Sequence, residues 1–123
     1  MSGSLNSVFL IGNLVRNPEY REVSGGNSVC SFCIATNERF KDRSGSKKEL
    51  VEYHNIVVWG RLAENANKFL TIGSSVFVEG KMKTRRYESN GSQHYRCEVV
   101  ASNIQFLGKK QAKADFYEEK VPF

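Results

Sequence analysis

Apolar side chains recur mostly at every second position, which is the period of strands with one buried face. The pattern predicts five main strands, at residues 7–17, 29–40, 51–60, 74–87 and 94–107. Clusters of Gly, Asn, Ser and Pro separate these segments and favour turns. A shorter strand-like stretch, EYREV, precedes the second strand and leads into a hairpin-type turn, SGGNS.

The period changes to that of a helix once, between the third and fourth strands. In RLAENANKFLTIG, the apolar residues Leu62, Ala66, Phe69 and Leu70 recur at helical spacing. Gly73 then suits the C′ position that follows the last turn of a helix. The sequence therefore predicts one short helix in this segment.

The number and order of these elements indicate a fold class. Short strands separated by turn signals are typical of a small barrel, and Gly12, Gly60 and Gly80 lie where bent barrel strands use glycine. We therefore expect an all-β protein, a five-stranded OB-fold barrel with one short helix between strands three and four. The barrel domain is predicted at 1–108. Residues 109–123 lose periodicity and are predicted to form a linker and a disordered C-terminal tail.

Strand alternation predicts which polar and aromatic side chains share a face. The fourth predicted strand places on one face Lys81, Lys83, Arg85 and Tyr87. The third strand places on one face Tyr53, Asn55, Val57 and Trp59. The second strand ends in Phe40, which is followed by Lys41 and Arg43. Such surfaces suit single-stranded nucleic acid, because cations follow phosphates and aromatic rings stack on unpaired bases. The alternatives are that Trp59 lies in the core and that the cationic face is merely solvated.

The charge of the chain supports the interpretation as a nucleic-acid-binding surface. The 123-residue chain has a net charge of +5 and a pI near 9.2, which favours a polyanionic partner. Residues 1–108 carry 14 Lys and Arg against 10 Asp and Glu, so the basic character belongs to the barrel.

No apolar run approaches the roughly 20 residues needed to cross a bilayer. The N-terminus, MSGSLNS, has no export signal, which favours a cytoplasmic protein with no membrane partner.

Catalytic and metal chemistry have little support in the sequence. It contains no G-x-S-x-G, no phosphate-binding glycine loop and no convincing carboxylate pair, so we expect no catalytic residues and no cofactor. Cys30 and Cys33 form a C-x-x-C, but a strand would place them on opposite faces, and no second ligand pair follows. We therefore expect no metal site. With Cys97 the cysteine count is odd, as in proteins of a reducing compartment.

Several ordered motifs resemble the bacterial single-stranded DNA-binding protein family. The segments that carry the resemblance are VFLIGNLVRNPEYR, FCIATNERFKD and EYHNIVVWGRLAENANKFLTIGSSVFVEGKMKTRRY, within about residues 4–108. The resemblance implies an OB-fold that assembles as a homotetramer and binds single-stranded DNA without reading base sequence. It also implies a bacterial, nucleoid-associated protein that protects single-stranded DNA in replication, recombination and repair.

The resemblance also assigns residues to these roles. Its stacking aromatics fall on Phe40, Tyr53, Trp59 and Tyr87, three of them where tryptophan is common in the family. Its basic DNA-binding positions fall on Lys83, Arg85 and Arg86 and, less securely, on Lys41, Arg43, Lys47, Lys48, Arg61 and Lys68. His54 matches a position that the family uses at a subunit contact.

The C-terminal segment, DFYEEKVPF, resembles the family's partner-docking tail. The resemblance implies that replication, recombination and repair proteins bind it through Asp115, Glu118, Glu119, Val121, Pro122 and Phe123. The linker before it, KKQAKA, is shorter than is usual in the family, and Lys120 interrupts the acids, so we expect weaker docking. The alternative is a frayed end without a role.

Other functions remain open from the sequence. An OB-fold RNA-binding protein or a primosome-accessory protein would also have basic and aromatic strands. An OB-fold nuclease would need carboxylates and a metal site, for which the sequence shows no constellation. A purely structural oligomer would leave the basic face solvated.

Overall fold

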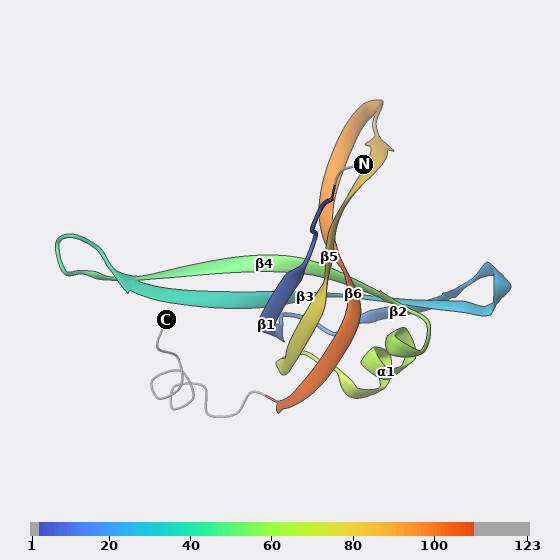
Figure 1. The fold of residues 1–123 in the computed structure, drawn as a ribbon, viewed down its shortest axis with the longest axis horizontal. Coiled ribbons are helices and arrows are strands. Elements are labelled where there is room, and N and C mark those ends of the chain that lie inside the picture. The colour runs from blue at the N-terminus through green and yellow to red at the C-terminus, as the bar shows by residue number, and fades with distance from the viewer. Residues whose placement is uncertain (1–2, 110–123) are drawn as a thin grey trace.

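The computed structural model describes residues 3–109, and its elements follow one another in the predicted order (Figure 1). They are β1 (Val8–Leu14), β2 (Glu19–Val23), the 3-10 turn η1 (Ser24–Gly26), β3 (Asn27–Lys41), β4 (Lys47–Trp59), α1 (Arg61–Phe69), β5 (Ser74–Ser89) and β6 (Ser92–Lys109). The predicted tail lies outside the described residues. Within them, no helix is long and apolar enough to cross a membrane.

Five of the strands close into a barrel. The hydrogen-bonded order is β1-β5-β6-β4-β3, and β1 also pairs with β3, which joins the two edges. Only the β4–β6 pairing is parallel, with Ile56 opposite Val99 and Val57 opposite Val100. The sixth strand, β2, pairs with the first part of β3 as a hairpin beside the ring. The predicted five-stranded OB-fold barrel with one helix between its third and fourth strands is therefore confirmed.

The core is formed by the inward-facing apolar side chains of the barrel strands and by the buried face of α1. Ile34, Ile56 and Val78 are fully buried there. Ala63 and Ala66 of α1 are also fully buried. Small side chains allow a helix to approach the strands closely, so α1 covers one end of the barrel without enlarging it.

Gly12 and Gly80 allow the strands to approach closely. A Cβ atom at Gly12 would lie 2.6 Å from the Ala35 carbonyl oxygen, and one at Gly80 would lie 2.2 Å from the Val100 carbonyl oxygen. Beside Gly80, the β5–β6 ladder shifts register, as at a β-bulge that bends a strand. This confirms the expected use of glycine in bent barrel strands at these two positions.

The end of α1 differs from the prediction. The helix ends at Phe69, and Leu70 is its extended C-cap residue, so Gly73 does not occupy the C′ position. Gly73 instead lies in a turn with φ +91, where the Ser74 amide donates to the Thr71 carbonyl (3.0 Å). The prediction took the nearest glycine as the helix end, but its left-handed conformation serves the turn into β5.

Two hairpins extend beyond the barrel in different directions (Figure 1). We call residues 38–53 the β3–β4 arm and residues 81–97 the β5–β6 arm; nearly every residue in both is exposed. The β5–β6 arm turns at Asn90 and Gly91, whose positive φ angles of 53 and 78 are those that an Asn-Gly hairpin turn requires. The turn of the β3–β4 arm is shorter than the interval between the predicted strands 29–40 and 51–60, because β3 continues to Lys41 and β4 begins at Lys47.

Candidate nucleic-acid interface

Strand register brings most of the predicted binding residues of β4 and β5 onto one face. Val57 lies opposite Val100 of β6, and Val100 lies opposite Lys81 of β5. Directly opposed residues share a face, and side chains alternate along each strand. One continuous surface, which we call the outer face, therefore carries Tyr53, Asn55, Val57, Trp59, Lys81, Lys83, Arg85 and Tyr87.

Three of the four predicted stacking aromatics lie on this outer face. Trp59 is 51% exposed and Tyr53 is 65% exposed, so Trp59 is not a core residue. Tyr87 is half-exposed, and its ring stacks on His94 of the neighbouring strand with centroids 5.3 Å apart. His94 thus holds the Tyr87 ring from one side, and the sequence alone did not single it out for this position.

Phe40 lies on the other face of the β3–β4 arm. It is opposite Lys48, and it points to the same side of β3 as the core residues Phe32 and Ile34. Tyr53 is opposite Ala35 and therefore faces the outer side. Phe40 is half-exposed at this position. The structure thus separates Phe40 from the other three rings, and its stacking role stays a prediction.

The basic residues of β5 are also divided between two faces. Lys83 and Arg85 lie on the outer face, whereas Arg86 is opposite Tyr95 and points to the other side. A guanidinium nitrogen of Arg85 lies 3.3 Å from Oε2 of Glu98. The sequence grouped Arg86 with its neighbours, but alternation along a strand places it away from them.

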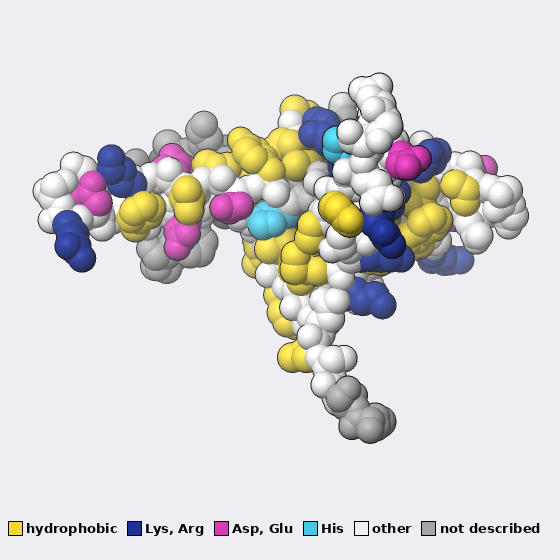
Figure 2. Space-filling model, turned by 90° about the horizontal axis from the view of Figure 1, so that it is seen from above, with side chains coloured by type: hydrophobic (Ala, Val, Ile, Leu, Met, Phe, Trp, Pro, Cys, Tyr) yellow, Lys and Arg dark blue, Asp and Glu magenta, His cyan; other side chains and the backbone are white. Residues whose placement is uncertain are grey.

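Further cations gather at the tip of the β3–β4 arm, where Figure 2 shows Lys and Arg side chains at the far end of the molecule. Lys41 lies opposite Lys47, which places both on the outer side of the arm. Arg43 lies in the turn, and Nζ of Lys48 is 3.9 Å from Asp42. These four predicted binding residues therefore lie together, but at a distance along the arm from Trp59.

Asp42 holds the turn at this tip. Its Oδ1 atom accepts hydrogen bonds from the Ser44 hydroxyl (2.7 Å) and from the backbone amides of Ser44 (3.0 Å) and Ser46 (2.9 Å). The Ser44 hydroxyl is the main cause that lowers the pKa of Asp42, the backbone amides add to it, and desolvation acts in the opposite direction. The carboxylate thus fixes the loop that presents the cations.

Arg61 and Lys68 belong to α1. Arg61 is exposed at the first position of the helix, two residues after Trp59. Lys68 lies in the last turn, with its ammonium 5.5 Å from the centroid of the Phe69 ring, which in turn contacts Phe106. Arg61 therefore lies at the end of the helix that follows Trp59 in the chain, and Lys68 lies at the other end.

His54 lies on the opposite face of β4 from Tyr53. It is half-buried, and its Nε2 atom is 2.9 Å from the Thr36 hydroxyl across the β3–β4 ladder. This hydrogen bond fixes the imidazole where the arm leaves the barrel. The subunit-contact role of His54 stays a prediction.

The sequence did not identify Arg96 and Glu98 as part of this site. Arg96 lies directly opposite Arg85, and Oε2 of Glu98 is 3.7 Å from Nε of Arg96. The Glu98 side chain is only 9% exposed. A two-residue turn at Asn90 and Gly91 fixes these cross-strand pairs. The position of the Asn-Gly dipeptide would therefore have predicted that Arg96 lies opposite Arg85.

The cysteines show no metal arrangement. Cys30 belongs to the core, opposite Val58, whereas Cys33 is opposite Asn55 on the other face of β3. Within residues 3–109, no group of three or more His, Cys, Asp and Glu side chains could hold a metal ion. The predicted separation of Cys30 and Cys33 is confirmed.

The predicted docking segment cannot be placed with these residues. Asp115, Glu118, Glu119, Val121, Pro122 and Phe123 lie outside the described part of the chain, so their role stays a prediction. The division into a domain at 1–108 and a tail at 109–123 also stays a prediction.

Comparison with known proteins identifies the family. The model of the single-strand binding protein family matches residues 5–107. Single-stranded DNA-binding protein 1 of Chlorobaculum tepidum is 43% identical over 114 residues, which are 91% of this chain and 70% of that protein. A single-stranded DNA-binding protein of Neisseria meningitidis is 41% identical over 106 residues, covering 85% of this chain but only 61% of the relative.

Solved structures agree with this relationship. A Plasmodium falciparum SSB complex with ssDNA has a TM-score of 0.81 at 31% identity, and the match covers 87% of this chain and 98% of that one. A deletion mutant of the single-stranded DNA binding protein from Thermus aquaticus has a TM-score of 0.75 at 36% identity, over 84% and 50% of the two chains. The fold, the order of its motifs and these matches together show that the chain belongs to the single-strand binding protein family.

Proposed function

We propose that this protein binds single-stranded DNA through the outer face. The observation that carries the proposal is the register that places Tyr53, Trp59 and Tyr87 on one surface with Lys83 and Arg85. Membership of the single-strand binding protein family supports it. So do the names of the relatives and the solved complex of a similar protein with ssDNA.

The proposed mechanism combines stacking with charge. Unpaired bases stack on the exposed rings, each base contributing roughly 1–3 kcal/mol, and this contribution is tolerant of sequence because every base has a flat π-face. Lys83, Arg85 and the arm-tip cations follow the phosphates, so binding weakens as salt concentration rises. No chemical step is required, in keeping with a family of non-catalytic DNA-binding proteins.

The cellular role that we propose is the coating and protection of single-stranded DNA during replication, recombination and repair. It rests on family membership and on the proposed binding. We propose a bacterial cytoplasmic, nucleoid-associated location for the same reason. Localisation of a fluorescent fusion before and after DNA damage tests this role. If the cellular distribution of the fusion does not change after damage, the result counts against the role.

Self-association is part of the proposal. Phe9 and Ile11 of β1 are 62% and 61% exposed, which leaves apolar side chains uncovered on the barrel itself. A homotetramer that covers them is consistent with the family. Light scattering should give a mass near four chains, and a monomeric mass across the micromolar range would rule this part out.

We also propose that the C-terminal segment recruits partner proteins. Pro122 and Phe123 follow Asp115, Glu118 and Glu119, which suits a partner with an apolar pocket and a basic rim. Deleting Phe123 should abolish capture of replication and repair proteins. Undiminished capture after this deletion would remove the docking role.

One experiment tests the DNA-binding proposal directly. Trp59 is the single tryptophan, so quenching of its fluorescence by oligo(dT) reports on the outer face. We expect quenching in the native protein and a loss of about 2–5 kcal/mol of binding free energy when Tyr53→Ala and Tyr87→Ala are combined. Tyr95→Ala is the control, because Tyr95 is as exposed as Tyr53 and lies on the other face of the β5–β6 arm.

The same titration separates the competing functions. An RNA-binding protein would prefer oligo(U) over oligo(dT) in competition. A nuclease would degrade labelled DNA in the presence of magnesium or calcium. Native affinity for oligo(dT) in the Tyr53 and Tyr87 double variant would exclude the outer face as the binding site.

A further inference from the structure

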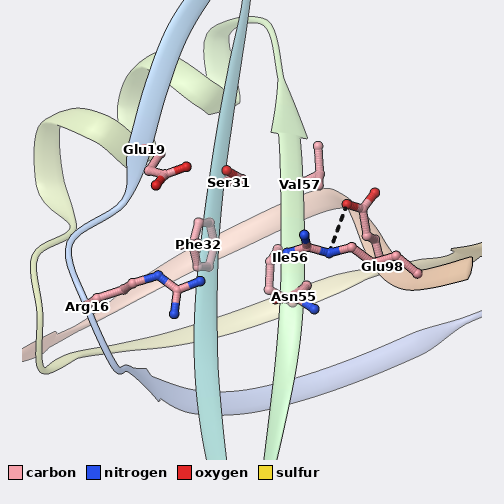
Figure 3. Close-up of a pocket in the computed structure, with 9 residues that line it drawn as sticks. Arg16, Glu19, Ser31, Phe32, Asn55, Ile56, Val57 and Glu98 are labelled. Carbon is pink, nitrogen blue, oxygen red and sulfur yellow. Dashed lines mark ion pairs between the residues drawn. The ribbon is translucent and has the colours of Figure 1, made fainter. Parts of the chain in front are cut away.

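A small polar pocket opens on the outer face (Figure 3). Asn55 and Val57 line it, and they are the two outer-face residues of β4 between Tyr53 and Trp59. The charged and polar side chains that surround it are Arg16, Glu19, Ser31, Asn55, Arg96 and Glu98. They come from the β1–β2 connection and from β2, β3, β4 and β6.

The frame of the barrel holds the walls of this pocket in place. The Val15 amide donates to the Cys33 carbonyl (3.1 Å), which fixes the β1–β2 connection beside β3 and brings Arg16 over the pocket. In Figure 3 the Arg16 side chain extends from this connection toward β3. Glu19 is paired with Ser31 across the β2–β3 ladder, so both lie on the same side.

The opposite wall is an ion-pair cluster. Arg85 and Arg96 are directly opposed across the β5–β6 ladder, where two like charges would repel one another. Oε2 of Glu98 lies 3.3 Å from Arg85 and 3.7 Å from Arg96 and thus compensates both. Within residues 3–109, the side-chain carboxylate of Glu19 and the Oε1 atom of Glu98 have no hydrogen-bond or ion-pair partner. The pocket therefore offers carboxylate acceptors beside guanidinium donors.

This composition does not suit a phosphate. Two carboxylates line the pocket, one of them almost buried, and their negative charge would repel an anion. The edge of a nucleobase is neutral and presents donors and acceptors side by side. Mixed acceptor and donor walls match such an edge, and an edge that leaves the almost buried Glu98 carboxylate unpaired is disfavoured.

The spacing along β4 leaves room for a nucleotide at this position. Tyr53 and Trp59 are six residues apart, which corresponds to roughly 20 Å along a strand. Adjacent bases of a stacked strand are separated by about 3.4 Å. Bases on the two rings therefore cannot be neighbours in a continuous stack, and at least one nucleotide between them passes over the pocket.

Guanine fits the walls better than thymine or adenine does. It presents the O6 and N7 acceptors, which arginine binds in a bidentate manner. It also presents the N1–H and 2-amino donors, which a carboxylate accepts. Thymine has only one N–H donor between two carbonyls, and adenine lacks an acceptor at position 6.

We propose that this pocket is a nucleobase subsite that prefers guanine, with Arg16 and Arg96 binding O6 and N7 and Glu19 and Glu98 accepting from N1–H and the 2-amino group. The subsite rests on the proposed single-stranded DNA binding and adds a local preference to it. Stacking on Tyr53, Trp59 and Tyr87 stays tolerant of sequence, and only the intervening nucleotide is read.

The test compares oligo(dT) strands that carry isolated dG, dA, deoxyinosine or 7-deaza-dG at the same positions. Deoxyinosine lacks the 2-amino group and 7-deaza-dG lacks N7, while their rings stack much as guanine does. We expect the dG strand to bind at least about fivefold more tightly than the dA strand. This factor is the lower end of the discrimination expected from one bidentate contact to a base. Deoxyinosine and 7-deaza-dG should each lose part of this advantage.

Variants link the preference to the pocket. In Arg16→Gln and in Glu19→Gln the dG-to-dA affinity ratio should fall toward one. Arg86→Gln is the charge-matched control for Arg16→Gln, because Arg86 points to the other face, and it should retain the native ratio. Affinity ratios cancel the general loss that follows removal of one positive charge.

The outcomes separate the two proposals. Equal affinity for dG, dA and deoxyinosine strands, together with tight oligo(dT) binding, overturns the subsite and leaves the proposed function intact. A dG advantage that persists in both pocket variants also overturns it, since stacking would then be the cause. Failure of every strand to bind would instead contradict the proposed function itself.

Discussion

The barrel and the β5–β6 arm are built from the same strand, β5, but they use its alternation differently. In residues 74–80, alternate side chains such as Val76 and Val78 are fully buried in the core. In residues 81–89, both faces are exposed, and alternation only decides which side carries cations. The same period-2 sequence pattern therefore specifies packing in one half of the strand and the position of charges in the other half.

This difference separates stability from binding. The barrel is stabilised by fully buried apolar side chains, each contributing roughly 1.5–3 kcal/mol relative to exposure. The arm is held by its ladder and by cross-strand pairs such as Tyr87 with His94, which contribute roughly 0.2–1 kcal/mol each. Substitutions in the barrel should thus unfold the protein, whereas those on the arm should change mainly its interactions.

The largest effect is expected at the junction of the two regions. In Gly80→Ala, the new Cβ atom would lie 2.2 Å from the Val100 carbonyl oxygen and 2.8 Å from Ala101 Cα, so backbone must move. We expect a loss of about 3 kcal/mol or more in the free energy of unfolding, because overpacking against backbone is poorly relieved. Urea unfolding followed by Trp59 fluorescence measures it.

Gly3→Ala is the control for this substitution, since a Cβ atom at Gly3 would have no atom within 4 Å. Its stability should stay within about 0.5 kcal/mol of the native protein. Equal stability of the Gly80 and Gly3 variants would mean that the arm is not anchored to the barrel by this close contact.

A smaller effect, on reactivity, distinguishes the cysteines of the two regions. Cys97 is exposed on the arm, whereas Cys30 is fully buried in the barrel, and burial raises the pKa of the Cys30 thiol from 9.0 to about 11. Because the thiolate is the reactive form, Cys97 should react with a thiol reagent at pH 8 at least about tenfold faster than Cys30. Colorimetric thiol counting in the native protein should show one fast group.

Cys97→Ser should remove that fast group, and denaturant should expose the remaining two thiols. Fast reaction of all three thiols in the native protein would show that the barrel opens as readily as the arm. That result would contradict the separation drawn between the two regions.

Most of the fold was predictable from local patterns. The five barrel strands and the helix follow from period changes, and the Asn90-Gly91 turn follows from its dipeptide. The errors are local too. Gly73 was assigned to the helix end because a glycine there looks the same in sequence whether it ends a helix or forms the next turn.

The candidate site was predictable only within single strands. Alternation correctly grouped Tyr53 with Trp59 and Lys83 with Arg85, because each pair shares one strand. That both pairs share one face depends on the parallel β4–β6 pairing, which no local pattern encodes. The same holds for the pocket, since Arg16 and Arg96 are 80 positions apart and meet only through barrel closure.

The smallest effect is expected at the tip of the other arm. Asp42 has a lowered pKa, chiefly through the Ser44 hydroxyl, so its contribution to stability is fully present above its ordinary unfolded pKa and is lost as pH falls through the lowered folded value. Asp42→Asn should therefore lower the thermal midpoint slightly at pH 7, and the difference from the native protein should vanish at strongly acidic pH. Glu88→Gln, at an exposed carboxylate of the β5–β6 arm, is the control. A midpoint difference for Asp42→Asn that grows on acidification would contradict the proposed role of Asp42 in holding the turn.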